Sequence, residues 1–304
     1  MQLIAGISRR RRSVTTVPRS RQNPARYADQ RAGREDRPAE WTMLTMATSA
    51  GHPGRDNEDF VGAVVDAVVL VDGAGITGIE EICRHGIAWY AHRLGATILA
   101  RLSLAQAVAD ASLLAIVSAA IDEVTDAHRG TCDVADPSSP SATVAVVRVA
   151  GGRADHLLLG DSVLVLDAVG APVQVVEDRR EPDIARPYQE QLTVLAADGV
   201  DADQVRNQAI TAFRAQRNQP GGFWVAKDSG NVVEHAATGS RPAAGLRTVT
   251  LLSNGASRAV DRFGFMHWPQ VSAHEPRELI RLVREAEKAS GVAPDDATAV
   301  RWQF

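Results

Sequence analysis

The sequence predicts an α+β sandwich. Short apolar runs rich in β-branched residues come in adjacent groups, whereas amphipathic stretches of helical period come in pairs between those groups. A regularly alternating parallel sheet would require a helix after each strand, and the order of the segments does not follow that rule. No glycine-rich phosphate loop follows the first apolar run.

The expected strands are taken in chain order. The segment 61–72 (VGAVVDAVVLVD) is an apolar run that ends on an aspartate and is typical of one buried strand. The same composition predicts the further strands 141–150, 156–159, 162–166 and 246–252. Gly151-Gly152 is expected to form the hairpin turn between the first two of these further strands.

The expected helices follow from apolar residues spaced three and four positions apart. Leu114, Val117, Ile121 and Val124 form one such stripe. Helices are also expected over 84–100, 186–197, 202–217 and 276–290. Pro276 suits the first turn of the last helix, and Gly291 suits its end.

Composition places the chain among globular proteins. Its 304 residues are 45% hydrophobic and 23% charged, which suffices for one large domain or two small ones. The net charge of -4 is not that of a protein whose whole surface binds nucleic acid. Residues 1–40 hold ten Arg and four acidic residues, a net charge of +6, so the remainder carries -4 minus +6, or -10.

The basic segment 1–42 contains the run from Arg9 to Arg12 and almost no periodic hydrophobicity, so a disordered tail is expected before a domain at 43–304. Three interpretations stay open: an arm for nucleic acid or an acidic membrane, a solvated tail, or an extension that is not translated, with synthesis starting at Met43 or Met46. The solvated or untranslated tail is favoured.

Neither membrane insertion nor export is expected. No apolar run is long enough to span a bilayer, and the residues after the arginines are too polar for a secretory signal. The cysteines, Cys83 and Cys132, are expected to be too few and too far apart for a disulfide or a cysteine-based zinc site. A reducing cytoplasm is the expected location.

Acidic residues interrupt or end the apolar runs. Asp59 precedes the first run, Asp72 ends it, Asp161 follows Leu157–Leu159, and Asp295-Asp296 precede the last expected strand. Carboxylates at the edge of a core are costly unless a cation is paired with them, and few Lys or Arg residues stand beside these. The pattern predicts a divalent cation held by oxygen ligands.

Six short motifs in a fixed order carry a resemblance that extends through nearly all of 43–304. They are Arg55-Asp56-Asn57-Glu58-Asp59, Asp72-Gly73-Ala74-Gly75, Ser141-Ala142-Thr143, Gly160-Asp161-Ser162, Ser253-Asn254-Gly255 and Asp295-Asp296-Ala297-Thr298. Together they resemble the motifs of the metal-dependent protein phosphatases, the PPM or type 2C serine/threonine phosphatases. Segments 85–90 and 222–225 are similar to a bacterial, actinobacterial branch of that family.

The resemblance implies a four-layer αββα fold, in which two antiparallel β-sheets pack as a sandwich flanked by pairs of helices. It also implies two Mn²⁺ or Mg²⁺ ions and a water that attacks phosphoserine or phosphothreonine. Asp72 would bridge both ions, the Gly73 carbonyl would bind one of them, and Asp295 would bind the other beside Asn254. Asp59 and Glu58 would act through metal-bound water.

Three further positions have roles implied by the same motifs. Arg55 would hold a phosphate oxygen, since a guanidinium reaches two oxygens at once. Asp161 is a candidate for a weak third metal position or for a structural hydrogen bond, and both interpretations stay open. Asp136 is a secondary candidate to assist Asp161.

The chain departs from the family pattern at three positions. Asn254 stands where an aspartate is usual, which removes a negative charge from the metal site. One residue, not two, separates Arg55 from Asn57, so another arginine is an alternative phosphate clamp. Ala74 stands where many eukaryotic members have a histidine, so the leaving-group proton would come from water.

Two functions follow from these observations. The first is a working cytoplasmic phosphatase of bacterial signalling whose partner is a phosphorylated protein, with no nucleic-acid or membrane partner. The alternative is a pseudophosphatase, weakened at Asn254, that binds phosphoproteins or regulates them. An unrelated α+β hydrolase is a third interpretation. The oligomeric state stays open.

Overall fold

The computed structural model describes residues 43–75, 81–105, 111–197 and 209–304. The chain divides into two units, Met1–Glu40 and Trp41–Phe304, and every described residue lies in the second. The expected tail at 1–42 and the first part of the helix expected over 202–217 therefore lie outside the described residues, whereas 209–214 are helical.

Two five-stranded antiparallel sheets form the centre of the described unit. The first sheet has the order β2-β3-β4-β5-β8, with β2 at Asp59–Val64, β3 at Ala67–Ala74, β4 at Ser141–Ala150, β5 at Arg153–Leu159 and β8 at Ala237–Pro242. The second has the order β1-β10-β9-β6-β7, with β1 at Met43–Ser49, β10 at Ala297–Gln303, β9 at Leu246–Leu252, β6 at Val163–Ala168 and β7 at Gln174–Val176.

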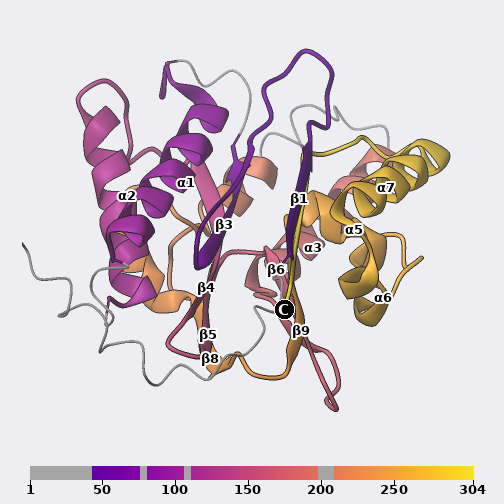
Figure 1. Ribbon diagram of the computed structural model, residues 1–304. Helices are drawn as coiled ribbons and strands as arrows, with labels where there is room; N and C mark the ends of the chain where they lie inside the picture. Colours follow the sequence, from indigo (N-terminus) through magenta and orange to yellow (C-terminus); the bar gives the residue numbers. More distant parts are fainter. Residues whose placement is uncertain (1–42, 76–80, 106–110, 198–208) are drawn as a thin grey trace, which may run out of the picture. The chain divides into compact units, whose positions relative to one another are not determined.

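Helices cover the outer faces of both sheets (Figure 1). Helices α1 (Gly86–Ala105) and α2 (Leu113–Arg129) pack on the first sheet, and helices α5 (Asn254–Asp261), α6 (Trp268–Ala273) and α7 (Pro276–Ser290) pack on the second. The helix α3 (Arg180–Ala197) and the 3₁₀ helix η2 (Gly230–His235) lie in the connections. The four-layer αββα sandwich is thus confirmed, with three helices, and not the expected pair, in one outer layer.

The sandwich explains why the strand sequences are apolar without alternation. In β3, Val69 and Val71 pack toward the helices, while Val68 and Leu70 pack toward the other sheet. A strand that is buried on both faces lacks the polar residues that mark a solvent-facing side. This burial fixes the position of Asp72 at the end of β3.

The apolar run 61–72 is not the single strand that the sequence predicts. It contains most of β2 and of β3, joined by a turn at Val65-Asp66, where the Val65 side chain is 92% exposed. The resulting hairpin is antiparallel, and its register pairs Asp59 with Asp72. Two carboxylates separated along the sequence therefore lie opposite each other at one end of the hairpin.

Other local predictions are confirmed. Gly151 and Gly152 have φ values of 57° and 75° and join β4 to β5, as expected of a tight hairpin turn. Gly291 ends α7 in the left-handed conformation with a φ of 63°. Leu114 is an exception because it is exposed on α2, and its neighbour Leu113 is the buried residue. None of the helices in the described part of the chain combines the length and apolar character needed to cross a bilayer.

Candidate metal centre

The β2–β3 hairpin brings the first two acidic positions together. Asp59 pairs in register with Asp72, and Asp72 pairs with Thr143 of β4. The Asn57 side chain accepts a hydrogen bond of 2.9 Å from the Asp59 amide, which orients the start of β2. Asp59 is only 3% exposed, and neither of its carboxylate oxygens has a hydrogen-bond partner among the described residues.

Asn254 connects Asp72 to Asp161. As the first residue of α5, Asn254 donates its backbone N–H to Asp72 Oδ2 at 3.2 Å and its side-chain amide to Asp161 Oδ2 at 3.3 Å. Gly160 precedes Asp161 with a φ of 91°, and a Cβ there would lie 2.6 Å from Thr143 Cγ2. Only glycine fits this position, so the Gly-Asp-Ser motif has a steric cause as well as a chemical one.

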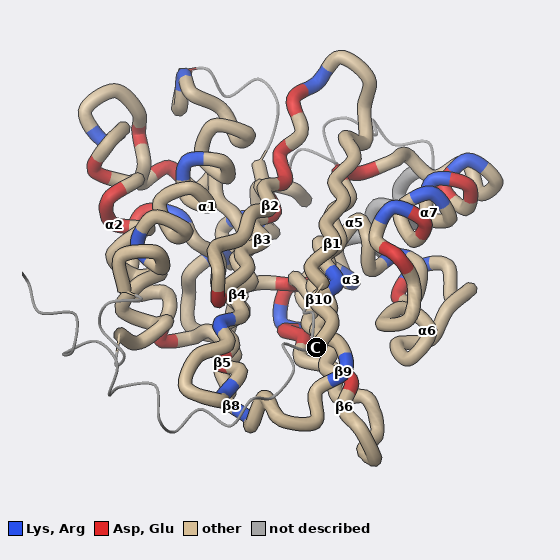
Figure 2. The backbone as a smooth tube through the Cα atoms, in the orientation of Figure 1, with Lys and Arg blue, Asp and Glu red and all other residues tan. Residues whose placement is uncertain are grey.

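Two arginines hold Asp295. Arg258 of α5 forms an ion pair of 2.7 Å with Asp295 Oδ2, and Arg284 of α7 donates to the Asp295 backbone carbonyl at 2.6 Å. Both guanidinium groups also pair with Glu287, whose side chain is almost fully buried. Basic and acidic residues are interspersed along α7 in Figure 2. Since the pairs are partly buried and linked, they fix the loop that carries Asp295.

Asp296 has a structural role that differs from that of Asp295. Its two carboxylate oxygens accept backbone N–H groups from Gly51 at 2.7 Å and from Glu58 at 2.6 Å. A Cβ at Gly255 would lie 1.9 Å from the Asp296 carbonyl oxygen, so the turn after Asn254 requires glycine. The two adjacent aspartates therefore have different roles. Asp296 holds the loop between Gly51 and Glu58, and Asp295 pairs with Arg258.

The electrostatics show a surplus of negative charge. Burial raises the pKa of Glu58 to about 7, and the nearby charges of Asp296 and Asp295 add to the effect. Burial also raises the pKa of Asp59 to about 7. The hydroxyls of Thr298 and Ser253 act in the opposite direction on Asp59 but hydrogen-bond elsewhere, Thr298 with the Thr48 hydroxyl and Ser253 with the Thr298 amide.

The same surplus extends to the strand ends. Burial, followed by the charges of Asp59, Asp161 and Asp295, raises the pKa of Asp72 well above its usual range. Burial also raises the pKa of Asp161, against the hydrogen bond from Asn254. Carboxylates that raise one another's pKa, together with an unpartnered buried carboxylate, are the donor set that a hard divalent cation requires. The residues present therefore fit such an ion.

Two clefts flank these carboxylates. The first has a volume of about 580 Å³ and is lined by Arg55, Glu58, His85, Trp89 and His92. Arg55 is exposed at its edge, and its positive charge opposes the rise in the pKa of Glu58. This cleft reaches the carboxylate group at Glu58.

The second cleft has a volume of about 590 Å³ and is lined by Asp161, Asn254, Arg258 and Glu181, among others. Burial and the Asp161 charge raise the pKa of Glu181 to about 8. Sequence reasoning did not identify Glu181 or Arg258. Arg258 stands four residues after Asn254, so both lie on one face of α5. This spacing was the signal in the sequence that could have identified Arg258.

The loop before β4 contains Asp136. Its side chain accepts the Ser138 amide at 2.7 Å within the loop itself, and its charge acts on Lys227. Among the described residues, no hydrogen bond or ion pair joins Asp136 to Asp161 or to a shared partner. The proposed assistance to Asp161 therefore has no support in the geometry of this loop.

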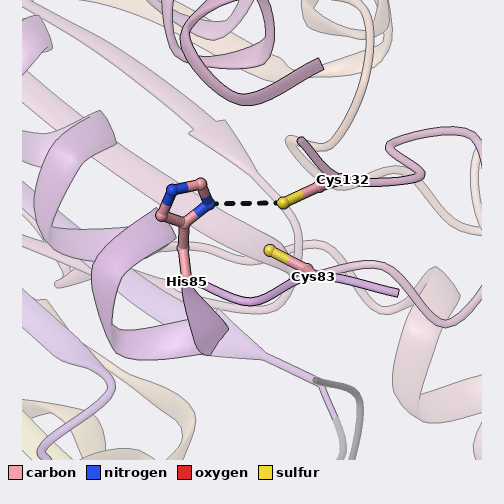
Figure 3. A group of neighbouring side chains, drawn as sticks. All are labelled: Cys83, His85 and Cys132. Atoms are coloured by element: carbon pink, nitrogen blue, oxygen red, sulfur yellow. Dashed lines mark hydrogen bonds between the residues drawn. The ribbon is translucent and has the colours of Figure 1, made fainter. Parts of the chain in front are cut away.

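The two cysteines lie close together, so the expectation that they are too far apart is wrong. Cys83 and His85 precede α1, Cys132 follows α2, and one donor atom from each of the three lies within 4.8 Å of the others. Figure 3 shows both sulfurs beside the imidazole ring, with Cys132 Sγ 3.3 Å from His85 Nδ1. The antiparallel packing of α1 and α2 brings these loops together, which separation along the sequence does not reveal.

Comparisons with known proteins agree with the geometry. A family model described as protein phosphatase 2C matches residues 45–270. The serine/threonine phosphatase PstP/Ppp of Mycobacterium tuberculosis superposes with a TM-score of 0.54 at 18% identity, covering 86% of this chain and 98% of that chain. Stp1 of Staphylococcus aureus gives a TM-score of 0.54 at 13% identity, covering 87% and 95%.

A third similar structure is PppA, a regulatory component of T6SS in Pseudomonas aeruginosa, with a TM-score of 0.54 at 16% identity, covering 86% of this chain and 97% of that chain. No curated protein matches the sequence. At these identities the structural likeness establishes the fold, whereas the match to the family model covers most of the chain.

Proposed function

Since the chain belongs to the protein phosphatase 2C family and is by that membership a metal-dependent protein phosphatase, we propose that residues 43–304 hydrolyse phosphoserine and phosphothreonine with two Mn²⁺ or Mg²⁺ ions. The observation that carries this proposal is the convergence of three buried carboxylates, Asp59, Asp72 and Asp161, whose pKa values burial raises. The charge of Asp295, which Arg258 pairs on one side, raises all three pKa values further.

Each carboxylate has a distinct task in this proposal. Asp72 and Asp295 would hold the two ions, with the Gly73 carbonyl as a further oxygen ligand, and Asp59 would act through water. Asn254 would add an oxygen beside Asp295, and Asp161 would serve a weaker third position. When bound, the ions supply a nucleophilic water and neutralise charge on the phosphoryl oxygens.

The remaining residues bind and orient the substrate. Arg55, at the edge of the first cleft, binds a phosphate oxygen. Arg258 keeps Asp295 in place and, through Glu287, ties α5 to α7. Because Ala74 follows Gly73 and no imidazole stands there, the leaving oxygen takes its proton from solvent. The partner is a phosphorylated protein, and we propose a cytoplasmic role in bacterial signalling.

Hydrolysis of p-nitrophenyl phosphate and of a phosphothreonine peptide in Mn²⁺ tests the function. The wild-type chain should turn over both, and Asp72→Asn should reduce kcat by at least about a hundredfold, since it removes the ligand shared by the two ions. Asp126→Asn, an exposed position on α2, is the matched control and should leave kcat unchanged.

Two results would contradict the proposal. Absence of wild-type turnover at millimolar Mn²⁺ would exclude the phosphatase activity. Binding of the phosphopeptide without turnover would identify a pseudophosphatase instead. Equal activity of Asp72→Asn and wild type would show that Asp72 is not a metal ligand.

A further inference from the structure

A cluster of soft ligands lies outside the carboxylate centre. Cys83 and His85 stand in the segment that enters α1, and Cys132 stands in the loop that leaves α2. Their donor atoms lie within 4.8 Å of one another, and both thiols are free. The three side chains point toward a common centre in Figure 3.

The spacing of these atoms fits a tetrahedral metal. Zn–S bonds of about 2.3 Å and Zn–N bonds of about 2.0–2.1 Å separate neighbouring ligand atoms by roughly 3.5–3.8 Å. Cys132 Sγ and His85 Nδ1 are 3.3 Å apart, within a few tenths of an ångström of that separation, and all three donor atoms lie within 4.8 Å of one another. We propose that Cys83, His85 and Cys132 bind one transition-metal ion of the zinc class, with the fourth position open to water.

The ligand chemistry selects the class of metal. Thiolates and imidazole prefer Zn²⁺ over Mg²⁺ and Mn²⁺, which favour carboxylate oxygens. The two centres on this chain therefore take different ions. A disulfide between the cysteines would involve only the two sulfurs and would not explain why His85 lies beside them. A metal ion would bind all three donor atoms.

Neighbouring groups hold the ligands in position. The His85 ring stacks on Trp89 with centroids 4.3 Å apart, which restrains its orientation. Cys83 is 2% exposed, and the Thr131 hydroxyl lies 3.7 Å from Cys132 Sγ. Such outer contacts are characteristic of protein metal sites.

The site lies next to the phosphatase cleft. His85 lines the cleft that contains Arg55 and Glu58. Ile87, the second residue of α1, packs so closely that a Cβ on Gly75 would lie 2.5 Å from its Cδ1. An ion at the three ligands therefore ties the start of α1 to the end of α2 and restrains the wall of the cleft beside the end of β3.

Cobalt substitution tests the site. The reduced, full-length protein is stripped with a chelator, and excess Mg²⁺ is added to fill the carboxylate centre before Co²⁺ is titrated. We expect one equivalent of Co²⁺ to produce thiolate-to-metal charge-transfer absorption and tetrahedral ligand-field bands, and Zn²⁺ to abolish both. Metal binding should release thiol protons and raise the Tm of the protein.

Variants assign the ligands. Cys132→Ser and His85→Asn should each weaken Zn²⁺ binding at least about tenfold and remove the rise in Tm. His274→Asn, at the end of α6, is the matched histidine control and should bind as the wild type does. Because His85 is partly exposed, its substitution tests the site even if Cys132→Ser does not fold.

Three outcomes would overturn the inference. These are a folded, reduced wild type without charge-transfer absorption, wild-type Zn²⁺ affinity in both variants, or a Cys83–Cys132 disulfide as the only chemistry detected by mass spectrometry. None of these measurements uses phosphatase activity, so failure here is separate from failure of the proposed function.

Discussion

At the scale of single residues, Asn254 lies where the metal centre is most crowded with charge. Its backbone and side chain donate to Asp72 and Asp161, so it acts in the metal-free protein as a hydrogen-bond donor between two carboxylates. An aspartate there would keep the backbone donor to Asp72, lose the side-chain donor to Asp161 and repel the Asp161 carboxylate. We infer that Asn254 lowers the cost of bringing the carboxylates together at the expense of affinity for the ion.

Asn254→Asp should therefore bind Mn²⁺ at least about tenfold more tightly, since ligand charge governs affinity for hard cations and changes of this size follow even from outer contacts. The metal-free variant should be less stable than the wild type. Calorimetric titration and thermal unfolding measure the two effects. Asn231→Asp, on an exposed asparagine outside the site, controls for added charge. Unchanged Mn²⁺ affinity would place Asn254 outside the metal shell.

The acidic residues that end apolar runs could be predicted from the sequence as candidate site residues. Asp72 and Asp161 were identified because a carboxylate at the end of a buried strand is costly without a partner. The group of Cys83, His85 and Cys132 could not be predicted, because local patterns do not encode which loops of two helices meet. Arg258 had a local signal in its spacing from Asn254, but its ion pairs with Glu287 and Asp295 join residues distant in sequence.

At the scale of elements, β1 distinguishes a chain that begins at Met43 from a chain that begins at Met46. β1 lies at the edge of its sheet and pairs only with β10, and its first three residues, Met43 to Thr45, supply three of the seven register pairs. Leu44 also packs against the core between the sheets. A chain that begins at Met46 lacks these contacts, whereas a chain that begins at Met43 keeps them.

The chain that begins at Met46 should be less stable than the chain that begins at Met43 by about 1–2 kcal/mol, or a Tm lower by roughly 2–8 °C. Thermal unfolding of the two chains measures the difference. Leu44→Ala in the longer chain separates the loss of side-chain burial from the loss of strand pairing. Equal Tm values would show that the first half of β1 contributes nothing to stability.

Most elements could be predicted from the sequence, because the β4 and β9 runs and the caps of α7 are strong local signals. The β2–β3 hairpin could not. Its strands face helices on one side and another sheet on the other, so the apolar run continues on both sides of the turn. Asp66 alone indicated that turn, and a single acidic residue is a weak signal.

At the scale of the whole molecule, the cleft carboxylates make stability depend on pH and on metal. The folded protein raises the pKa of Asp59 to about 7, while an unfolded chain holds it near 3.9. Between these values the folded state binds more protons than the unfolded state, so this group destabilises the metal-free fold increasingly as pH rises. His128 and His156, whose pKa burial lowers, act in the opposite direction below about pH 6.5.

Asp59→Asn isolates this contribution, because the histidines are common to both proteins. In the presence of a chelator the variant should have a higher Tm than the wild type at pH 8, by roughly 5–10 °C, and the gain should shrink toward pH 5. Mn²⁺ should raise the Tm of the wild type more than that of the variant. A variant less stable than the wild type at pH 8 would contradict the assignment of Asp59 as an unpaired buried charge.

The carboxylate of Asp296 fastens both ends of the loop that carries Arg55, since it binds the amides of Gly51 and Glu58. A loop anchored at its base can gain or lose a residue with little penalty, because closure entropy grows only with the logarithm of length. The spacing between Arg55 and Asn57, which is one residue shorter than the resemblance leads one to expect, falls inside this anchored loop and ahead of β2. A change in the length of this loop should therefore alter the reach of the Arg55 side chain and leave the register of β2 with β3 unchanged.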